Sequence, residues 1–231
     1  MKYTLAFDIY GTLINTAGVV EMLEEMIGEK AKIFSESWRS KQLEYSFRRG
    51  LMKQYEDFSV CTKDALDYCN RLFGTDLTES QKSELMNQYK VLPAFPDVEE
   101  GLQKLKNANH KLYAFSNGSK EAIKQLLSNA NLTDYFNGIV SVEDVQIFKP
   151  NPNTYEHFMH ETGSQKSNTW LISSNPFDVI GSIAYGFRSV WVQRNPKIIF
   201  DPWTSDSHGV IEPSTIVDSL TDLSSTLDKQ E

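Results

Sequence analysis

The first apolar run of the chain is short and ends at a charged residue. Residues 3–7 are mostly apolar, Asp8 follows them, and Gly11 marks a turn shortly afterwards. A short apolar run that is bounded by a turn is typical of a buried strand. The pattern therefore predicts a strand over residues 3–7, with Asp8 at its carboxyl end.

A helical periodicity replaces this pattern from about residue 15 to residue 91. The stretch is rich in Glu, Lys, Leu, Met and Gln and contains no proline. Its apolar residues recur at spacings of three and four, as an amphipathic helix requires. The clearest set is Val19, Met22, Leu23 and Met26. Thr78 followed by Gln81 matches a capping box, so a helix should begin there.

Beyond Pro93 and Pro96 the pattern alternates between short apolar runs and amphipathic segments. Strands are predicted over residues 111–115, 139–141, 170–172 and 189–192. Helices are predicted over residues 98–106, 120–129, 152–161 and 176–185. Such alternation indicates a parallel sheet with helices on both faces. The tail, residues 219–231, is expected to be a surface helix or a frayed end.

These patterns together predict an α/β protein with two parts. A Rossmann-like parallel-sheet core would comprise residues 1–14 plus 93–231. A helical cap, residues 15–92, would be inserted after the first strand. A chain of 231 residues can bury a core of this size without disulfides or a metal.

The charge and hydropathy of the chain limit the kinds of binding partner that we expect. The net charge is -8, whereas a nucleic-acid-binding protein would need a basic face. No segment approaches the roughly 20 apolar residues of a membrane span. We therefore expect neither a nucleic-acid partner nor a membrane partner, while a local cluster of donors can still bind a small anion.

The two cysteines indicate a reducing compartment. Cys61 and Cys69 are eight residues apart in a predicted helix, which separates them by about 12 Å along its axis. A disulfide needs Cα atoms within about 7 Å. We therefore expect two free thiols and a cytoplasmic protein.

Polar residues gather where the predicted strands end, which is where ligands bind to open parallel sheets. Three strand ends carry Asp8, Tyr10 and Thr12; then Ser116, Asn117 and Gly118; then Ser173, Ser174, Asn175 and Asp178. Lys149–Pro150 lies in the loop between the last two. Taken singly, each of these groups is an ordinary turn or loop. Their coincidence at one sheet edge predicts an active site, in which a desolvated aspartate can act as a nucleophile.

The same segments resemble, in order and spacing, the four signatures of the haloacid dehalogenase superfamily. They are residues 7–13, residues 116–118, Lys149–Pro150 and residues 173–178. The resemblance covers nearly the whole chain. It implies the HAD-like fold and a covalent intermediate on Asp8.

Within that superfamily the phosphatases fit less well. Phosphatases of this superfamily have the motif Asp-x-Asp at the first signature, and its second Asp protonates the leaving oxygen. This chain has Tyr10 at that second position. They also carry an early acid in the fourth signature for Mg²⁺, where this chain has Ser173 and Ser174. Both departures suit a halide leaving group, which needs no proton. We therefore expect no metal and no cofactor.

The L-2-haloacid dehalogenase branch resembles the cap as well, through residues 38–45 around Arg39. This resemblance implies hydrolysis of short L-2-haloalkanoic acids to D-2-hydroxyalkanoic acids through an aspartyl ester, with inversion at C2. The catalytic residues it implies are Asp8, Thr12, Arg39, Ser116, Lys149, Tyr155, Ser173, Asn175 and Asp178. The implied substrate and halide pocket is Tyr10, Arg39, Leu43, Phe58, Ser116, Asn117 and Phe177.

Each group has an expected task. Ser116 would hold the substrate carboxylate, and Arg39, Asn117 and Tyr10 would receive the halide. Leu43, Phe58 and Phe177 would enclose the alkyl side. Thr12 and Ser173 would hold Asp8 and Lys149 in place. Lys149 would keep Asp8 ionised, and Asp178, oriented by Asn175 and Lys149, would activate water.

The chain departs from this branch at two positions, and other readings stay open. Ser40 replaces a frequent Gln and Phe177 a frequent Trp near the expected pocket, which leaves chain-length and halide preference undecided. The alternatives are a haloacetate or fluoroacetate dehalogenase, a Mg²⁺-dependent small-molecule phosphatase, and a non-catalytic binding module. Relatives that this chain resembles are often homodimers. His157 and His160, three apart on one helix, are expected to be surface or packing residues.

Overall fold

The centre of the molecule is a parallel sheet. In a computed structural model that describes residues 2–207 and 209–229, six strands lie in the order β3-β2-β1-β4-β5-β8. They are β1 Thr4–Phe7, β2 Lys111–Ser116, β3 Gly138–Ser141, β4 Thr169–Ser173, β5 Arg188–Val192 and β8 Thr215–Val217. β1 lies in the middle and pairs in parallel with β2 and β4. The predicted α/β parallel-sheet class is confirmed.

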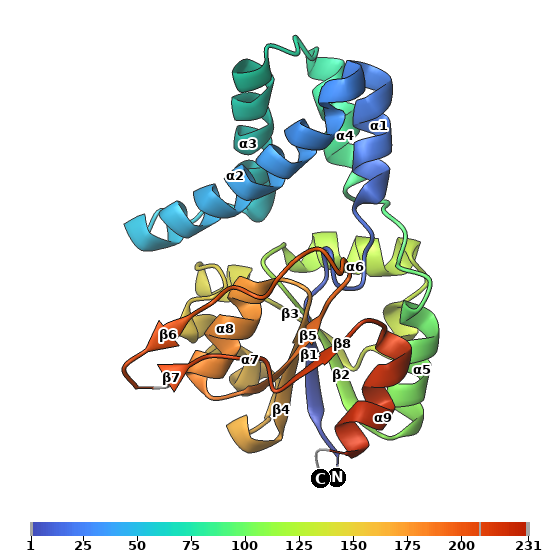
Figure 1. Ribbon diagram of the computed structural model, residues 1–231, viewed down its shortest axis with the longest axis vertical. Coiled ribbons are helices and arrows are strands. Elements are labelled where there is room, and N and C mark those ends of the chain that lie inside the picture. The colour runs from blue at the N-terminus through green and yellow to red at the C-terminus, as the bar shows by residue number, and fades with distance from the viewer. Residues whose placement is uncertain (1, 208, 230–231) are drawn as a thin grey trace.

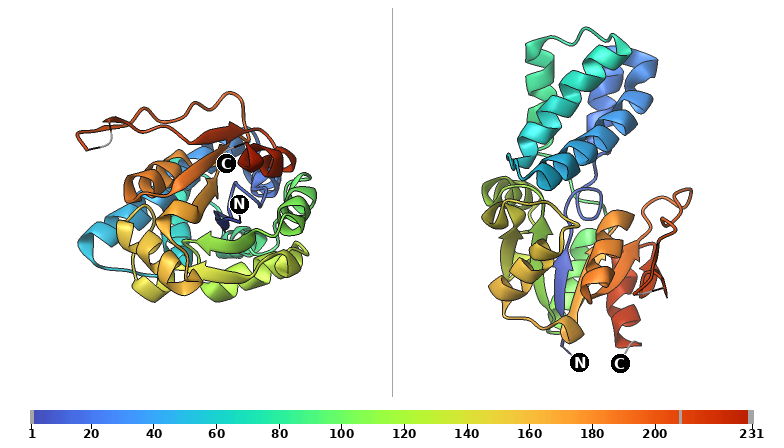
Figure 2. Two further views of the ribbon diagram at one scale, coloured as in Figure 1. Left: turned by 90° about the horizontal axis from the view of Figure 1, so that it is seen from below. Right: turned by 90° about the vertical axis from the view of Figure 1, so that its left-hand side faces the viewer.

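Helices cover both faces of this sheet (Figure 2, left). They are α5 Val98–Asn107, α6 Lys120–Asn129, α7 Pro152–Thr162, α8 Pro176–Tyr185 and α9 Leu223–Asp228. Successive residues of a strand point to opposite faces. Leu5 and Phe7 accordingly pack with α5, α6 and α9, whereas Ala6 packs with aromatic residues of α7. This two-sided burial explains why the strands are almost continuously apolar.

A group of helices stands over the carboxyl ends of the strands (Figure 1). They are α1 Ala17–Ile27, α2 Ala31–Met52, α3 Phe58–Phe73 and α4 Glu79–Gln88. The predicted capping box of Thr78 and Gln81 is present at the start of α4. α3 ends at Gly74, whose φ of 55° favours glycine. The predicted helical character of residues 15–91 is therefore confirmed, in four separate α-helices.

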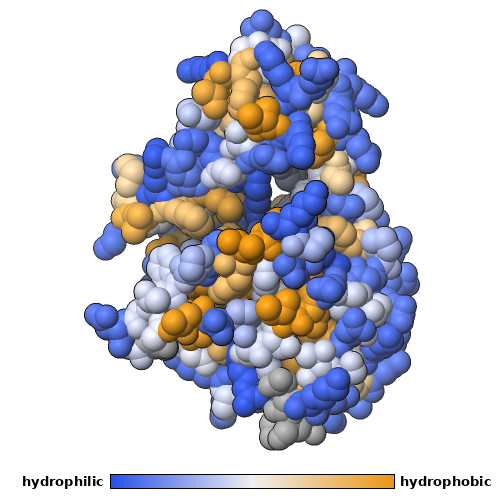
Figure 3. Space-filling view, viewed as in Figure 1, coloured by the Kyte–Doolittle hydropathy of each residue, from blue (hydrophilic) through white to orange (hydrophobic). Residues whose placement is uncertain are grey.

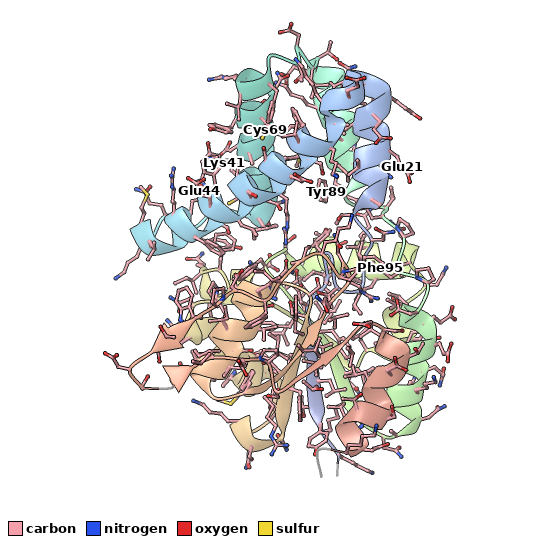
Figure 4. The ribbon with its side chains drawn as sticks, in the orientation of Figure 1. Glu21, Lys41, Glu44, Cys69, Tyr89 and Phe95 are labelled. Carbon is pink, nitrogen blue, oxygen red and sulfur yellow. The ribbon has the colours of Figure 1, made fainter. Side chains whose placement is uncertain are left out.

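The chain enters and leaves this helical group at one place, which we call the linker ribbon, residues 13–15 and 93–95. The backbone of Phe95 donates to Leu13 O at 2.9 Å, and that of Asn15 donates to Pro93 O at 2.8 Å. Figure 4 labels Phe95 beside this crossing. We propose that residues 15–92 form the cap and that residues 1–14 plus 93–231 form the core.

The hydrophobic interior is continuous across the ribbon. One cluster of buried side chains contains Leu5 and Phe7 of the sheet and also Phe34 and Trp38 of α2. Fully buried Leu13, Ile14 and Leu92 belong to the same cluster. The helical group therefore shares part of its core with the sheet.

Two features at the C-terminal end were not expected from the sequence. β8 extends the sheet beyond β5, and β6 Thr204–Ser205 pairs with β7 Gly209–Val210 in a small hairpin. These strands have two or three residues, too few to show a periodicity. The tail forms the expected helix, α9, which packs on the core through the fully buried Leu223 and Leu227 and exposes Ser225 and Asp228. Residues 230–231 lie outside the described part.

The sequence predicted neither a membrane span nor a disulfide, and the structure can be compared with both predictions. No helix within residues 2–207 and 209–229 is long and apolar enough to cross a membrane. Cys61 and Cys69 are both buried free thiols. Burial raises the pKa of each thiol to about 11, which keeps both protonated near neutral pH.

Candidate active site

The carboxyl ends of β1, β2 and β4 bring the predicted polar residues together beneath the cap (Figure 1). Asp8 directly follows β1, Ser116 ends β2, and Ser173 ends β4. All three side chains are buried, Asp8 with 7% of its surface exposed. The parallel register of the sheet is therefore what assembles the site from distant parts of the chain.

Three donors converge on one oxygen of Asp8. Asp8 Oδ2 accepts from Asn175 Nδ2 at 2.7 Å, from Thr12 Oγ1 at 2.9 Å and from Ser173 Oγ at 3.2 Å. Asn175 Nδ2 also approaches Tyr10 O at 3.3 Å. This cradle fixes the Asp8 carboxylate plane and leaves Oδ1 turned toward Lys149.

Lys149 supplies the positive charge beside Asp8. Its fully buried Nζ donates to Asp8 Oδ1 at 3.1 Å, to Asp178 Oδ2 at 2.6 Å and to Phe115 O at 3.1 Å. Burial would raise the pKa of Asp8, but the charge and hydrogen bond of Lys149, with help from Thr12 and Arg39, hold that pKa below its ordinary value. Asp8 is thus kept as a carboxylate, as the sequence predicted.

Asp178 lies behind Lys149 and has a different environment. Tyr155 donates its hydroxyl to Asp178 Oδ1 at 3.0 Å, so Lys149 and Tyr155 hold the two oxygens. Burial raises the pKa of Asp178 to about 6, against the lowering effect of Lys149. The Asn175 side chain bonds to Asp8, whereas its backbone oxygen accepts from Asp178 N at 3.1 Å, so Asn175 meets Asp178 through the backbone. Two carboxylates with pKa values shifted in opposite directions suit different tasks.

A close approach of α8 makes this arrangement fit. A Cβ on Gly181 would collide with the Pro150 side chain and would lie 2.6 Å from the Tyr155 hydroxyl. Glycine at this position therefore lets α8 bring Asp178, one turn earlier, against Tyr155 and Lys149.

The donor set does not favour a divalent cation. The Lys149 ammonium stands between Asp8 and Asp178, where a hard dication would need free carboxylate oxygens. Among the described residues, no three His, Cys, Asp or Glu side chains gather as metal ligands. His157 lies 3.4 Å from Asp144, and His160 is exposed beside Glu161.

The cap contributes the opposite wall. Arg39 on α2 reaches down to the core, where its Nη2 lies 3.4 Å from Asn175 Oδ1. Leu43, one turn later on α2, and Phe58, which begins α3, point into the same space. Ser40 is exposed on α2 and does not line this space, so the expectation that it lies near the pocket was wrong.

A cavity of about 20 Å³ lies between Asp8 and the cap. We call it the catalytic pocket. Its walls are Asp8, Tyr10, Arg39, Leu43, Phe58, Ser116, Asn117, Lys149, Asn175 and Phe177. Each of these residues was predicted for the site from the sequence. The other four predicted residues, Thr12, Tyr155, Ser173 and Asp178, lie behind the pocket and bond to Asp8, to Asp178 or to Lys149.

Sequence reasoning missed the groups that hold the loop after β1. Arg194 donates from Nη2 and Nε to Thr12 O at 2.7 and 3.1 Å, and its Nη1 pairs with both oxygens of Asp97. Tyr89 packs between Tyr10 and Trp38, with ring centres 6.1 and 5.3 Å away (Figure 4). No local motif marks such residues, because their partners are far away in the sequence.

Comparisons with known proteins agree with this geometry. A family model described as haloacid dehalogenase-like hydrolase matches residues 5–192. The chain is 37% identical over 194 residues, 84% of each protein, to an (S)-2-haloacid dehalogenase of Pseudomonas sp. (strain YL). It is 37% identical to haloacetate dehalogenase H-2 of Moraxella sp. (strain B), over 82% of this chain and 85% of the relative. The solved structure of L-2-haloacid dehalogenase from Xanthobacter autotrophicus superposes on this chain with a TM-score of 0.88. The match covers all of both chains at 29% identity. A second structure of that enzyme holds covalently bound chloropropionic acid.

Proposed function

Since the chain belongs to the haloacid dehalogenase-like hydrolases, we propose that it converts short L-2-haloalkanoic acids to D-2-hydroxyalkanoic acids. The chain is a hydrolase of carbon–halide bonds. The observation that carries the specific reaction is the position of Asp8. Asp8 lines the catalytic pocket, three donors hold its Oδ2, and its Oδ1 accepts only from the Lys149 cation among the described contacts.

In the first step Asp8 Oδ1 attacks C2 of the substrate, and the carbon–halogen bond breaks as the carbon–oxygen bond forms. The electron pair of that bond leaves with the halide. Arg39, Asn117 and Tyr10 line the pocket and would receive the developing negative charge. A donor preorganised at such a place contributes about 3–4 kcal/mol to catalysis at comparable sites. No proton is needed by the leaving group.

The substrate carboxylate needs its own partner. Ser116 Oγ lines the pocket and accepts from Gly118 N at 3.2 Å, which leaves the Ser116 hydroxyl proton available among the described contacts. We assign this hydroxyl to the substrate carboxylate. Leu43, Phe58 and Phe177 would enclose the alkyl group and keep water away during the attack.

In the second step water attacks the carboxyl carbon of Asp8, not C2. The ester carbonyl oxygen is then Oδ2, and the negative charge that develops on it falls within the cradle of Thr12, Ser173 and Asn175. Asp178 would take one proton of the water and return it to the alkoxide oxygen as the bond from the carboxyl carbon to Oδ1 breaks. The hydroxy acid then leaves, and Asp8 loses the remaining proton of the water to solvent and is again a carboxylate. Backside attack inverts C2 once, so an L-acid gives a D-product.

A haloacetate is the second candidate substrate. The catalytic pocket of about 20 Å³ holds about one water molecule, and one relative is named a haloacetate dehalogenase. Any 2-haloacid must therefore displace the cap side of the pocket to enter, and the smallest acid requires the smallest displacement.

The test is incubation of the purified protein with racemic 2-chloropropionate in excess chelator. Chloride release should stop at half conversion with D-lactate as the product. Chloride release from both enantiomers, or L-lactate, would contradict the stereochemical proposal. Absence of chloride from 2-chloropropionate, its bromo analogue and chloroacetate would contradict dehalogenation, and Mg²⁺-dependent phosphate release would then favour the phosphatase alternative.

Isotope labelling separates the two steps. In a single turnover in H₂¹⁸O with enzyme in excess, the label should appear in the peptide that contains Asp8. The hydroxyl oxygen of the product should be unlabelled, because it comes from Asp8 Oδ1. Label in the product after one turnover would favour direct attack of water on C2.

The cellular location and the oligomeric state remain predictions. We expect a cytoplasmic location, which the buried free thiols support. We also expect a homodimer, and sedimentation equilibrium would measure the mass directly.

A further inference from the structure

Gln42 is a buried amide on α2 that the proposed chemistry does not use. Its side chain is 2% exposed, and it lies three residues after Arg39, on the same side of the helix. A buried amide is costly unless its donors and acceptor are paired. The partners of Gln42 therefore show what it is there to hold.

The hydrogen bonds of Gln42 run in one direction. Thr62 donates its only hydroxyl proton to Phe58 O at 2.9 Å, so Thr62 Oγ1 must accept from Gln42 Nε2, at 2.5 Å. This leaves Gln42 Oε1 facing Arg39 Nη1, which donates to it at 2.7 Å. The reverse amide orientation would set two donors against each other.

This chain of hydrogen bonds fixes the Arg39 guanidinium. The guanidinium is planar, so holding Nη1 also sets the direction of Nη2. Nη2 lies toward Asn175 Oδ1 at 3.4 Å, a weak contact that would not orient the group alone. The rigid hold on Arg39 therefore comes from the cap, through Gln42.

Gln42 itself does not reach the reacting atoms. It borders a cavity of about 160 Å³ between the cap and the core, which we call the cap chamber. The cap chamber shares Tyr10, Arg39, Phe58 and Asn175 with the catalytic pocket, but Gln42 does not line the pocket. We propose that Gln42, locked by Thr62, is a positioning residue that aims the Arg39 guanidinium at the departing halide. This proposal rests on the proposed function.

The kinetic test compares Gln42→Met with the wild type on 2-chloro- and 2-iodopropionate. Methionine keeps the length of the side chain but removes both hydrogen bonds. We expect kcat to fall about 10- to 100-fold, as for other partners that orient a catalytic group, with a change in KM of less than about threefold. The loss should be larger for chloride than for iodide, because the smaller anion concentrates its charge. An unchanged kcat, or equal losses on the two substrates, would overturn the proposal.

Two controls distinguish positioning from general damage. Gln88→Met removes a partly buried cap glutamine that does not line either cavity, and it should behave like the wild type. In an Arg39→Met background, Gln42→Met should cost nothing further, because the group it positions is absent. A further tenfold loss in that background would show that Gln42 acts by another route.

A substrate-free readout keeps the inference separate from the reaction. The ¹⁵N order parameter of the Arg39 Nε–H should be high in the wild type, roughly 0.8, and drop below about 0.6 in Gln42→Met. Equal order in the two proteins would overturn the positioning role. If the wild type released no halide from any 2-haloacid, the proposed function would fail, while this measurement would still decide the role of Gln42.

Discussion

The two walls of the catalytic pocket are built differently. On the core wall, Asp8 accepts four hydrogen bonds from side chains at the end of β4 or in the segments that follow β1, β3 and β4, namely Thr12, Lys149, Ser173 and Asn175. On the cap wall, Arg39, Leu43 and Phe58 come from two helices, and one long contact of 3.4 Å joins Arg39 to the core. The core wall is therefore fixed by the sheet and the loops after its strands, whereas Arg39 of the cap wall is held mainly by Gln42 within the cap.

This difference assigns the two half-reactions to different parts of the chain. The core holds the nucleophile and the cradle that ester hydrolysis requires. In the proposed mechanism the cap supplies Arg39 for the halide and Leu43 and Phe58 for the alkyl group, and Phe177 of the core completes the apolar wall. Substitutions of Asp8 and of the donors around it should therefore affect every substrate alike. Substitutions of the residues that would meet the halogen or the alkyl group, Arg39 in the cap and Phe177 in the core, should discriminate between substrates.

Asp8→Asn should have the largest effect and should abolish turnover, because a neutral amide cannot form the ester. Halide release is the measurement, with mass spectrometry to show that the amide has not deamidated. Asp67→Asn, which removes a cap carboxylate paired with Lys82, should retain activity. An active Asp8→Asn protein with an intact amide would remove Asp8 from the mechanism.

Arg39→Met should lower kcat about 10²- to 10³-fold, because one preorganised donor for the leaving group is lost. The loss should increase from iodide to chloride, which the core variants should not reproduce. Arg48→Met on the same helix, where the side chain is exposed and paired with Glu44, is the matched control. A loss that is the same for all halides would place Arg39 on the substrate carboxylate instead.

The acid limb of the pH profile should report Asp178, not Asp8. Asp178 has a pKa raised to about 6 by burial, so it becomes protonated and inactive as a base when the pH falls below that value. Asp8 has a lowered pKa and stays ionised through this range. We expect kcat to fall about tenfold per pH unit below pH 6.

Tyr155→Phe sharpens that prediction. The Tyr155 hydroxyl bonds to Asp178 and lowers its pKa. Its removal should move the acid limb to higher pH. If the acid limb of the pH profile did not move, a group other than Asp178 would determine its pKa.

Phe177→Ala should have the smallest effect and should change selectivity. The Phe177 ring packs on Phe47 of α2 and separates the catalytic pocket from outer cavities of about 510 and 420 Å³. Opening this wall should raise the ratio of kcat/KM for 2-bromohexanoate over 2-bromopropionate roughly tenfold. Leu43→Ala, which enlarges the pocket without reaching either outer cavity, should not change the ratio.

The lining of the outer cavity of about 420 Å³ is largely apolar. Figure 3 shows hydrophobic side chains gathered where the free end of α2 approaches the core, the region lined by Phe47, Leu51, Ile147 and Trp203. A longer alkyl chain that passed Phe177 would therefore meet an apolar surface rather than a charged one.

The fold could be predicted because its signals are local, and the pocket walls because the sequence resembles a known family. A short apolar run followed by Asp8, or a helix that carries Arg39, can be identified within a few residues. The roles remained predictions, since neither spacing nor resemblance gives a hydrogen-bond partner. The structure shows that the Asn175 side chain bonds to Asp8 and meets Asp178 only through the backbone, and that Ser40 is exposed and does not line the pocket.

The supporting residues could not be predicted for the opposite reason. Arg194 holds Thr12 across 182 positions of sequence, and Gln42 meets Thr62 across 20. An isolated Arg or Gln carries no mark of such a partner. β8 was missed because its three residues gain their strand geometry from pairing with β5, not from their own periodicity.

The shared interior beneath the linker ribbon has a consequence for unfolding. Leu13, Ile14 and Leu92 lie in a cluster that includes both sheet and cap side chains, so melting α1–α4 alone would expose apolar surface of the core. Apolar burial contributes about 25 cal/mol per Å², which penalises a species with a melted cap and an intact sheet. The two parts should therefore lose structure in a single cooperative transition, although the chemistry divides between them.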